Sequence, residues 1–133
     1  MNRFEATVTA IEEASPLHLI SFDAGGTALK MLLLTEGSAL RRGAKATLGI
    51  EPAMITLIKG CEGAIGCANL LHATITGITH GTLLCTVSLQ IESLKLEATL
   101  LEHEAQSLHL QTGTSVTAML RASDLYIVEF GDG

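Results

Sequence analysis

The feature that most constrains this chain is an internal repeat. The segment EATVTAI at residues 5–11 returns as HATITGI at residues 72–78, with Ala, Thr, Thr and Ile at matching places. Ala6 corresponds to Ala73, a shift of 73 − 6 = 67 residues that also relates the segments that follow. A repeat of this kind decides what the folding unit is. The chain is therefore predicted to contain two diverged copies of one small unit.

The spacing of the repeat changes once along the chain. Gly43 corresponds to Gly113, a shift of 113 − 43 = 70 residues, so the second copy holds 70 − 67 = 3 extra residues before this point. The segment that joins the copies is rich in glycine and small residues, which is typical of a linker. We predict a first domain at residues 1–60, a linker at 61–68 and a second domain at 69–133.

The composition favours a packed protein with an aliphatic core. Hydrophobic residues make up 47% of the chain, charged residues 17% and aromatic residues only 3%. A unit of about 60 residues buries only about 60% of the surface of its unfolded chain, so it is marginally stable alone. We therefore expect the copies to pack together and the protein to form a homo-oligomer, a dimer or a trimer.

Charge and hydropathy argue against several classes of protein. A membrane-spanning helix needs about 20 mostly apolar residues, and charged residues or glycines interrupt every apolar run before that length. The net charge is −6, whereas a protein that binds nucleic acid normally carries a basic patch. The three cysteines are odd in number and have no known metal spacing, which argues against a disulfide scaffold. We expect a cytoplasmic protein without membrane insertion or direct nucleic-acid binding.

The hydropathy pattern is mostly that of β-strands. FEATVTAI at 4–11 alternates apolar and polar residues with a period of two. Turn signals such as DAGG at 23–26 separate the alternating runs. One segment in each copy, at 35–43 and at 102–113, instead favours a short helical turn that ends at a glycine. We predict an all-β fold of two tandem OB-like five-stranded β-barrels, each with one short helical turn.

Two motifs carry a resemblance to a known family. NLLHATITGI at 69–78 is followed at suitable spacing by SVTAMLRASDLYIV at 115–128, and NRFEATVTAI at 2–11 repeats the first motif. The chain resembles the molbindin (Mop or TOBE domain) family in its tandem di-domain form. Such domains also form the C-terminal part of molybdate-responsive regulators and of molybdate importer ATPases. The resemblance implies that the ligand is molybdate or tungstate, held at interfaces between domains or subunits, and that there is no cofactor.

The resemblance also implies which residues form the oxyanion site. A tetrahedral dianion offers only acceptors, so it needs backbone N–H groups, hydroxyls and one or two cations. The closing Lys-Ala-Ser of the family falls on residues 121–123, and its intermediate Thr-x-x-Ser falls on residues 35–38 of the first copy. The candidate residues are Arg121, Ala122, Ser123, Asn69, Ala68, Lys59, Gly60, Thr35 and Ser38.

Each candidate also has an ordinary structural interpretation. The alternatives are an ion pair of Arg121 with Asp124 or Glu129, the start of a strand at Asn69, and a solvated side chain at Lys59. The two hydroxyls of the first helical turn would then cap that turn. Both interpretations stay open at the level of the sequence.

Departures from the family pattern support a second hypothesis. The family's Ser-Ala-Arg-Asn segment reads GCAN at 66–69, the closing motif of the first copy reads EPA at 51–53, and Glu104 stands in place of a hydroxyl. We interpret the chain as an intracellular molybdate- or tungstate-binding protein for storage, buffering or sensing. The alternative is a regulatory or oligomerisation TOBE module that has lost the oxyanion or binds another small anion.

Catalysis finds no support in the sequence. There is no Ser-His-Asp arrangement, no acid pair at a defined spacing and no cofactor fingerprint. A zinc site that uses His103, His109 and a cysteine is the weakest alternative, so no metal is expected. The sequence predicts a binding protein and not an enzyme.

Overall fold

The computed structural model describes residues 2–34, 40–60 and 63–131. The elements are β1 (Asn2–Ala14), β2 (Leu17–Ala24), β3 (Thr27–Leu34), β4 (Lys45–Ile50), the 3-10 turn η1 (Pro52–Met54), β5 (Thr56–Ile58), β6 (Asn69–His80), β7 (Leu84–Ile91), β8 (Leu94–Leu101), α1 (Glu102–Ser107), β9 (Ser115–Leu120) and β10 (Tyr126–Phe130). The predicted all-β fold is confirmed, and the helical turn predicted for the second copy is α1, between β8 and β9. The corresponding turn of the first copy falls mainly on residues 35–39, outside the described residues.

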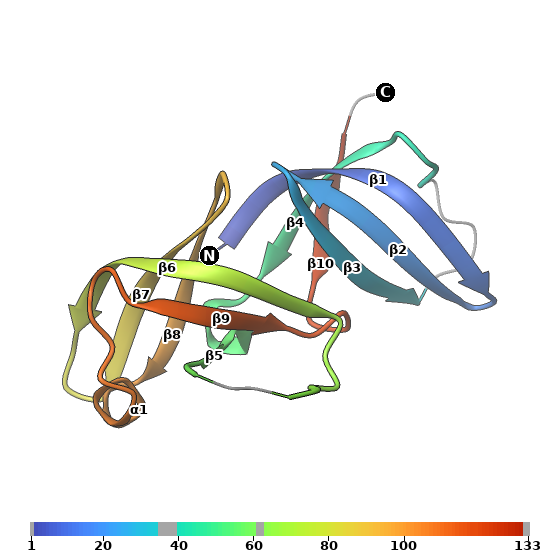
Figure 1. The fold of residues 1–133 in the computed structure, drawn as a ribbon. Coiled ribbons are helices and arrows are strands. Elements are labelled where there is room, and N and C mark those ends of the chain that lie inside the picture. The colour runs from blue at the N-terminus through green and yellow to red at the C-terminus, as the bar shows by residue number, and fades with distance from the viewer. Residues whose placement is uncertain (1, 35–39, 61–62, 132–133) are drawn as a thin grey trace.

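The two sheets do not follow the order of the two copies. One sheet has the strand order β10-β4-β1-β2-β3 and the other has the order β5-β9-β6-β7-β8. The last strand of each copy thus pairs with the fourth strand of the other copy, and Figure 1 shows β10 running beside β4. The domain boundaries at residues 60 and 69, which follow the sequence repeat, stay a prediction. The hydrogen-bonded sheets do not coincide with these domains, because each sheet takes its fifth strand from the other copy.

The alternation in the sequence places one face of each strand in a core. Every second residue of β2 is buried, and the same holds for β7. These buried residues are His18, Ile20, Phe22 and Ala24 in β2 and Cys85, Val87, Leu89 and Ile91 in β7. Burial of apolar surface, at about 25 cal/mol per Å², is the main term that holds such a sheet in its curled form.

Both copies bend their sheets with the same two features. The ladder of β1 with β2 shifts register after Val8, and the ladder of β6 with β7 shifts register after Ile75. Such a bulge bends its strand and increases the local twist. Gly43 and Gly113 donate their N–H groups to the carbonyls of these two residues, at 2.9 and 2.7 Å. Both glycines have φ near +90° (90° and 93°), a conformation that side chains disfavour.

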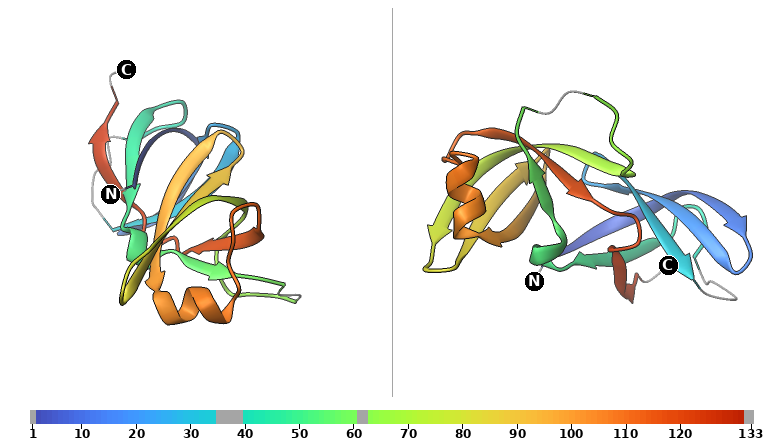
Figure 2. Two further views of the ribbon diagram at one scale, coloured as in Figure 1. Left: turned by 90° about the vertical axis from the view of Figure 1, so that its left-hand side faces the viewer. Right: turned by 90° about the horizontal axis from the view of Figure 1, so that it is seen from below.

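The two curled sheets lie side by side, and α1 is at the far end of the second one (Figure 2). No helix within the described ranges is both long and apolar enough to cross a bilayer. Segments that are far apart in the sequence meet where the two sheets adjoin.

Candidate functional site

Asn69, a predicted ligand residue, begins β6 and is only 2% exposed. Its side-chain oxygen accepts the N–H of Lys30 at 2.7 Å, and its amide group donates to the carbonyls of Lys30 at 2.9 Å and Leu120 at 3.0 Å. Lys30 lies on β3, the edge strand of the other sheet. The side chain of Asn69 therefore joins the two copies.

The same contact occurs at the equivalent place in the first copy. Asn2 accepts the N–H of Glu97 at 2.8 Å and donates to its carbonyl at 2.9 Å. The repeat shift relates both pairs, because 69 − 2 = 67 and 97 − 30 = 67. We call these two contacts, of Asn2 with Glu97 and of Asn69 with Lys30, the inter-copy clasps. A buried amide that saturates the main chain of an edge strand is a strong structural tie.

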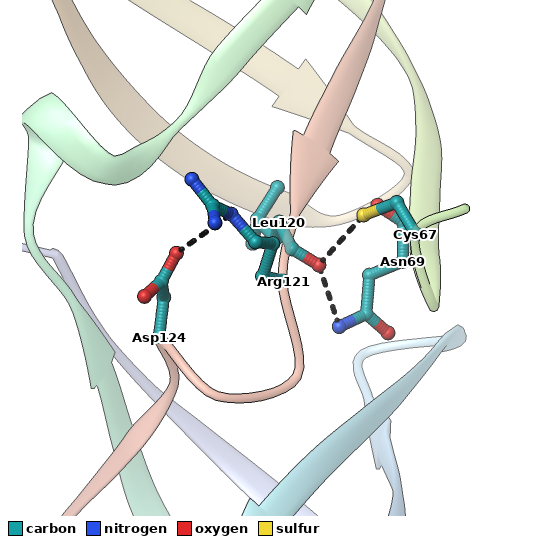
Figure 3. A network of polar contacts seen from close by, with 5 residues as sticks. All are labelled: Cys67, Asn69, Leu120, Arg121 and Asp124. Atoms are coloured by element: carbon teal, nitrogen blue, oxygen red, sulfur yellow. Dashed lines mark hydrogen bonds and ion pairs between the residues drawn. The ribbon is translucent and has the colours of Figure 1, made fainter. Parts of the chain in front are cut away.

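Arg121, Ala122 and Ser123 lie in the loop between β9 and β10, close to the clasp at Asn69. The carbonyl of Ala122 accepts the N–H of Leu32 on β3 at 3.0 Å, so the loop also touches the other sheet. Arg121 Nε lies 3.6 Å from Asp124 Oδ2, and the Arg121 side chain is 70% exposed. Figure 3 shows this ion pair on one side of the loop and the Leu120 carbonyl on the other. The structure thus contains the ion pair that was the structural alternative for Arg121.

The Leu120 carbonyl accepts two side-chain hydrogen bonds in this region. It accepts from the Asn69 amide and, at 3.4 Å, from the thiol of Cys67 (Figure 3). Ala68, the exposed residue between them, was also predicted as a ligand residue. The structure brings Ala68, Asn69 and the loop at 121–123 to one junction between the sheets.

The remaining predicted residues lie elsewhere or outside the described residues. Lys59 Nζ donates to the carbonyl of Leu108 at 2.8 Å, so it caps the C-terminal end of α1. Gly60 follows with a φ of +67°. Thr35 and Ser38 are not among the described residues. The structure therefore brings together only part of the predicted set.

Glu104, one of the departures from the family pattern, has a structural role. Its carboxylate accepts the N–H of Leu101 at 2.8 Å and so caps the first turn of α1. It also lines a hollow of about 160 Å³ beside Ala53 and Thr99. No basic side chain lines this hollow among the described residues. The carboxylate on its wall makes this hollow unsuited to an oxyanion.

A larger hollow, which the sequence did not predict, lies where the start of β1 meets the second sheet. Its volume is about 520 Å³, and its lining includes Arg3, Lys95, Thr76 and Ser88. Two cations and two hydroxyls are the groups that an oxyanion requires. Glu97 also lines it and supplies one opposing charge. The sequence carried no signal for this hollow, because Arg3 and Lys95 are far apart in the chain and meet only in the folded protein.

The fold and the junction define a class of protein: a duplicated small β-barrel unit whose copies exchange their last strands. Residues 67–127 match the family model of the TOBE domain. This match falls on the second copy and confirms the resemblance noted in the sequence.

One solved structure is similar over almost the whole length. It is the crystal structure of the cytoplasmic molybdate-binding protein ModG with molybdate bound, with a TM-score of 0.87 and 21% sequence identity. The match covers 95% of this chain and 94% of that chain. A comparison with curated protein sequences gives no match. The likeness to ModG confirms the paired OB-like barrel fold.

Proposed function

We propose that this protein binds molybdate or tungstate in the cytoplasm, in a buffering, storage or sensing role, and does not transform its ligand. The observation that carries the proposal is the combination of a TOBE domain at residues 67–127 with a fold that follows ModG over 95% of the chain. ModG itself is a cytoplasmic molybdate-binding protein whose crystals contain molybdate.

The loop at residues 121–123 is our first location for the anion. It supplies a cation, a hydroxyl and backbone N–H groups at a junction between the copies. The ion pair of Arg121 with Asp124 is long and involves an exposed side chain. Such pairs contribute about 0–1 kcal/mol to stability. The guanidinium is therefore free to turn toward an anion at little cost. The hollow beside Arg3 and Lys95 is the second location.

Calorimetric titration with molybdate, tungstate and sulfate tests this function. We expect heat from the first two anions and none from sulfate. Loss of a hydrogen bond to a charged group costs about 1.5–3 kcal/mol, so Arg121→Ala is expected to weaken binding about tenfold or more. Arg42→Ala removes another exposed guanidinium, outside this loop, and serves as the matched control.

The outcome of these titrations also separates the two locations. If Arg3→Ala abolishes binding and Arg121→Ala does not, the anion lies in the larger hollow. If a folded protein gives no heat with any of the three anions, the proposal fails. The alternative, a TOBE module that has lost the oxyanion, would then be the better description. The ion pair of Arg121 and the capping role of Glu104 favour that alternative.

We also propose that the protein is a homo-oligomer. Leu17 pairs with Leu34, and 67 positions later Leu84 pairs with Leu101. These four residues are 40%, 70%, 55% and 53% exposed. Each copy therefore exposes an apolar pair to solvent at the equivalent position. Association would remove this surface from water. The mass in solution, measured by light scattering, would be that of a dimer or trimer, and a monomer would refute this.

A further inference from the structure

A cluster of three metal-binding side chains lies at the end of the second sheet, away from the junction described above. It consists of His80, Cys85 and Glu102, whose ligand atoms all lie within 4.8 Å of one another. His80 is the last residue of β6 and faces Cys85 of β7 in the ladder. Glu102 is the first residue of α1. Three separate elements thus aim an imidazole, a thiol and a carboxylate at one point.

We propose that His80, Cys85 and Glu102 form a binding site for Zn²⁺. Zinc is bound in proteins by histidine nitrogen, cysteine sulfur and carboxylate oxygen, in a tetrahedral arrangement. Three protein ligands would leave the fourth position open to water or to a further ligand. The side chain of His80 is 58% exposed, which gives an ion a path from solvent to the buried Cys85.

The carboxylate of Glu102 supplies the second, independent argument. Its Oε1 lies 2.5 Å from His80 Nδ1, whereas its Oε2 is buried and accepts no hydrogen bond of good geometry from the described residues. The backbone of Glu102 is held in place because its N–H donates to the Leu83 carbonyl at 2.8 Å. A buried carboxylate oxygen without a partner is costly. A cation between the three side chains would remove this cost.

The first copy provides an internal comparison for this cluster. The positions of His80 and Cys85 correspond to Glu13 and His18, since 80 − 67 = 13 and 85 − 67 = 18. His18 Nε2 lies 3.6 Å from Glu13 Oε1, so a histidine and a carboxylate meet there as well. The first copy has no thiol at this place. The proposed zinc site therefore belongs to the second copy alone.

Cobalt titration tests the site, because Co²⁺ takes the place of Zn²⁺ and its absorption reports the ligands. In a Cys61→Ser/Cys67→Ser background, Cys85 is the only thiol. We expect one Co²⁺ per chain, with a thiolate-to-cobalt charge-transfer band, and its displacement by Zn²⁺. In the same background Cys85→Ala is expected to abolish the band. His80→Asn and Glu102→Gln are expected to weaken Co²⁺ binding at least about tenfold each, since even outer-shell changes have that effect.

The matched control is His18→Asn, which removes the equivalent histidine of the first copy and is expected to leave the band unchanged. His80 is exposed, so its variant tests the site even where a change at the buried Cys85 impairs folding. Absence of a thiolate band at saturating Co²⁺ would overturn the proposal. An unchanged affinity in both His80→Asn and Glu102→Gln would overturn it too. Neither result depends on whether the protein binds an oxyanion.

Discussion

Asn2 and Asn69 hold the same place in the two copies and make the same pair of main-chain contacts, to Glu97 and Lys30 respectively. The partner residues carry opposite charges, yet the clasps are alike because each amide binds backbone atoms only. At the barrel ends the copies differ, with Glu13 in the first copy where the second has His80. The copies have thus kept the contacts that hold them together and changed the side chains that carry chemistry.

The exchanged strands show a second difference between the copies. In one sheet Tyr126 of β10 faces Gly49 of β4, and in the other Thr56 of β5 faces Met119 of β9. These are equivalent positions, since 126 − 56 = 70 and 119 − 49 = 70. In both pairs a larger residue faces a smaller one. The larger residue is Tyr126 on the fifth strand of one sheet, but Met119 on the fourth strand of the other. The two exchanged strands thus differ in the size of the side chain that they place against the neighbouring strand.

The largest effect is expected from breaking one clasp and then the other. Asn69→Ala removes three hydrogen bonds of a buried side chain, two to the main chain of Lys30 and one to the Leu120 carbonyl. We expect a loss of about 2–3 kcal/mol in the free energy of unfolding, and about 1–2 kcal/mol for Asn2→Ala, which removes two bonds. Urea unfolding measures both. Equal losses would mean that the bond to Leu120 contributes nothing.

A smaller effect is expected from the exchanged strand. A Cβ at Gly49 would lie 2.7 Å from a ring carbon of Tyr126, so Gly49→Ala forces β10 away from β4. We expect a loss of about 1–2 kcal/mol, measured by thermal unfolding. Gly77→Ala is the matched control, because its Cβ would meet Ser88 at an ordinary 3.9 Å. If the two alanine variants are equally stable, the ring does not pack on Gly49 as described.

The smallest expected effect is a shift in a titration. The hydroxyl of Tyr126 donates to Glu51 Oε1 at 3.0 Å, and this hydrogen bond is the main cause that raises the pKa of Tyr126. Because the folded pKa is the higher one, the contact stabilises the fold below about pH 10 and is lost as pH rises through the raised pKa.

Tyr126 is the only tyrosine in the sequence, so absorbance at alkaline pH follows it directly. We expect its midpoint above the ordinary value and a return toward about 10 in Glu51→Gln. Glu129→Gln, which changes an exposed carboxylate of the same strand β10, is the control. A midpoint that Glu51→Gln leaves in place would show that the hydrogen bond does not cause the shift.

The repeat and the alternation predicted most of the fold, because both depend on local patterns. Strand faces, the helical turn at α1 and the turns at Gly43 and Gly113 all follow from residues close in sequence. The exchange of β5 and β10 does not. Alternation shows which side of a strand is buried, but it does not show which of two similar sheets the strand completes.

The candidate site was predicted less well than the fold. Asn69 was predicted to bind the oxyanion, which stays a prediction, and the contact of its side chain with Lys30 across the copies is visible only in the assembled structure. His80, Cys85 and Glu102 have no motif spacing, since a hairpin and a whole strand separate them in the chain. Arg3 and Lys95 meet in one hollow for the same reason. Groups that converge through tertiary structure leave no local pattern.

The strand exchange has a consequence for the order in which the protein is made. The sheet that contains β1 is built first on the ribosome, yet it is completed by β10 (Tyr126–Phe130), which follows all the other strands in chain order. Until those residues emerge, β4 is an open edge, and open strand edges pair readily with other chains. Loss of β10 by truncation would therefore damage the sheet that contains β1, and a chain stalled before β10 would expose an edge that is prone to aggregation.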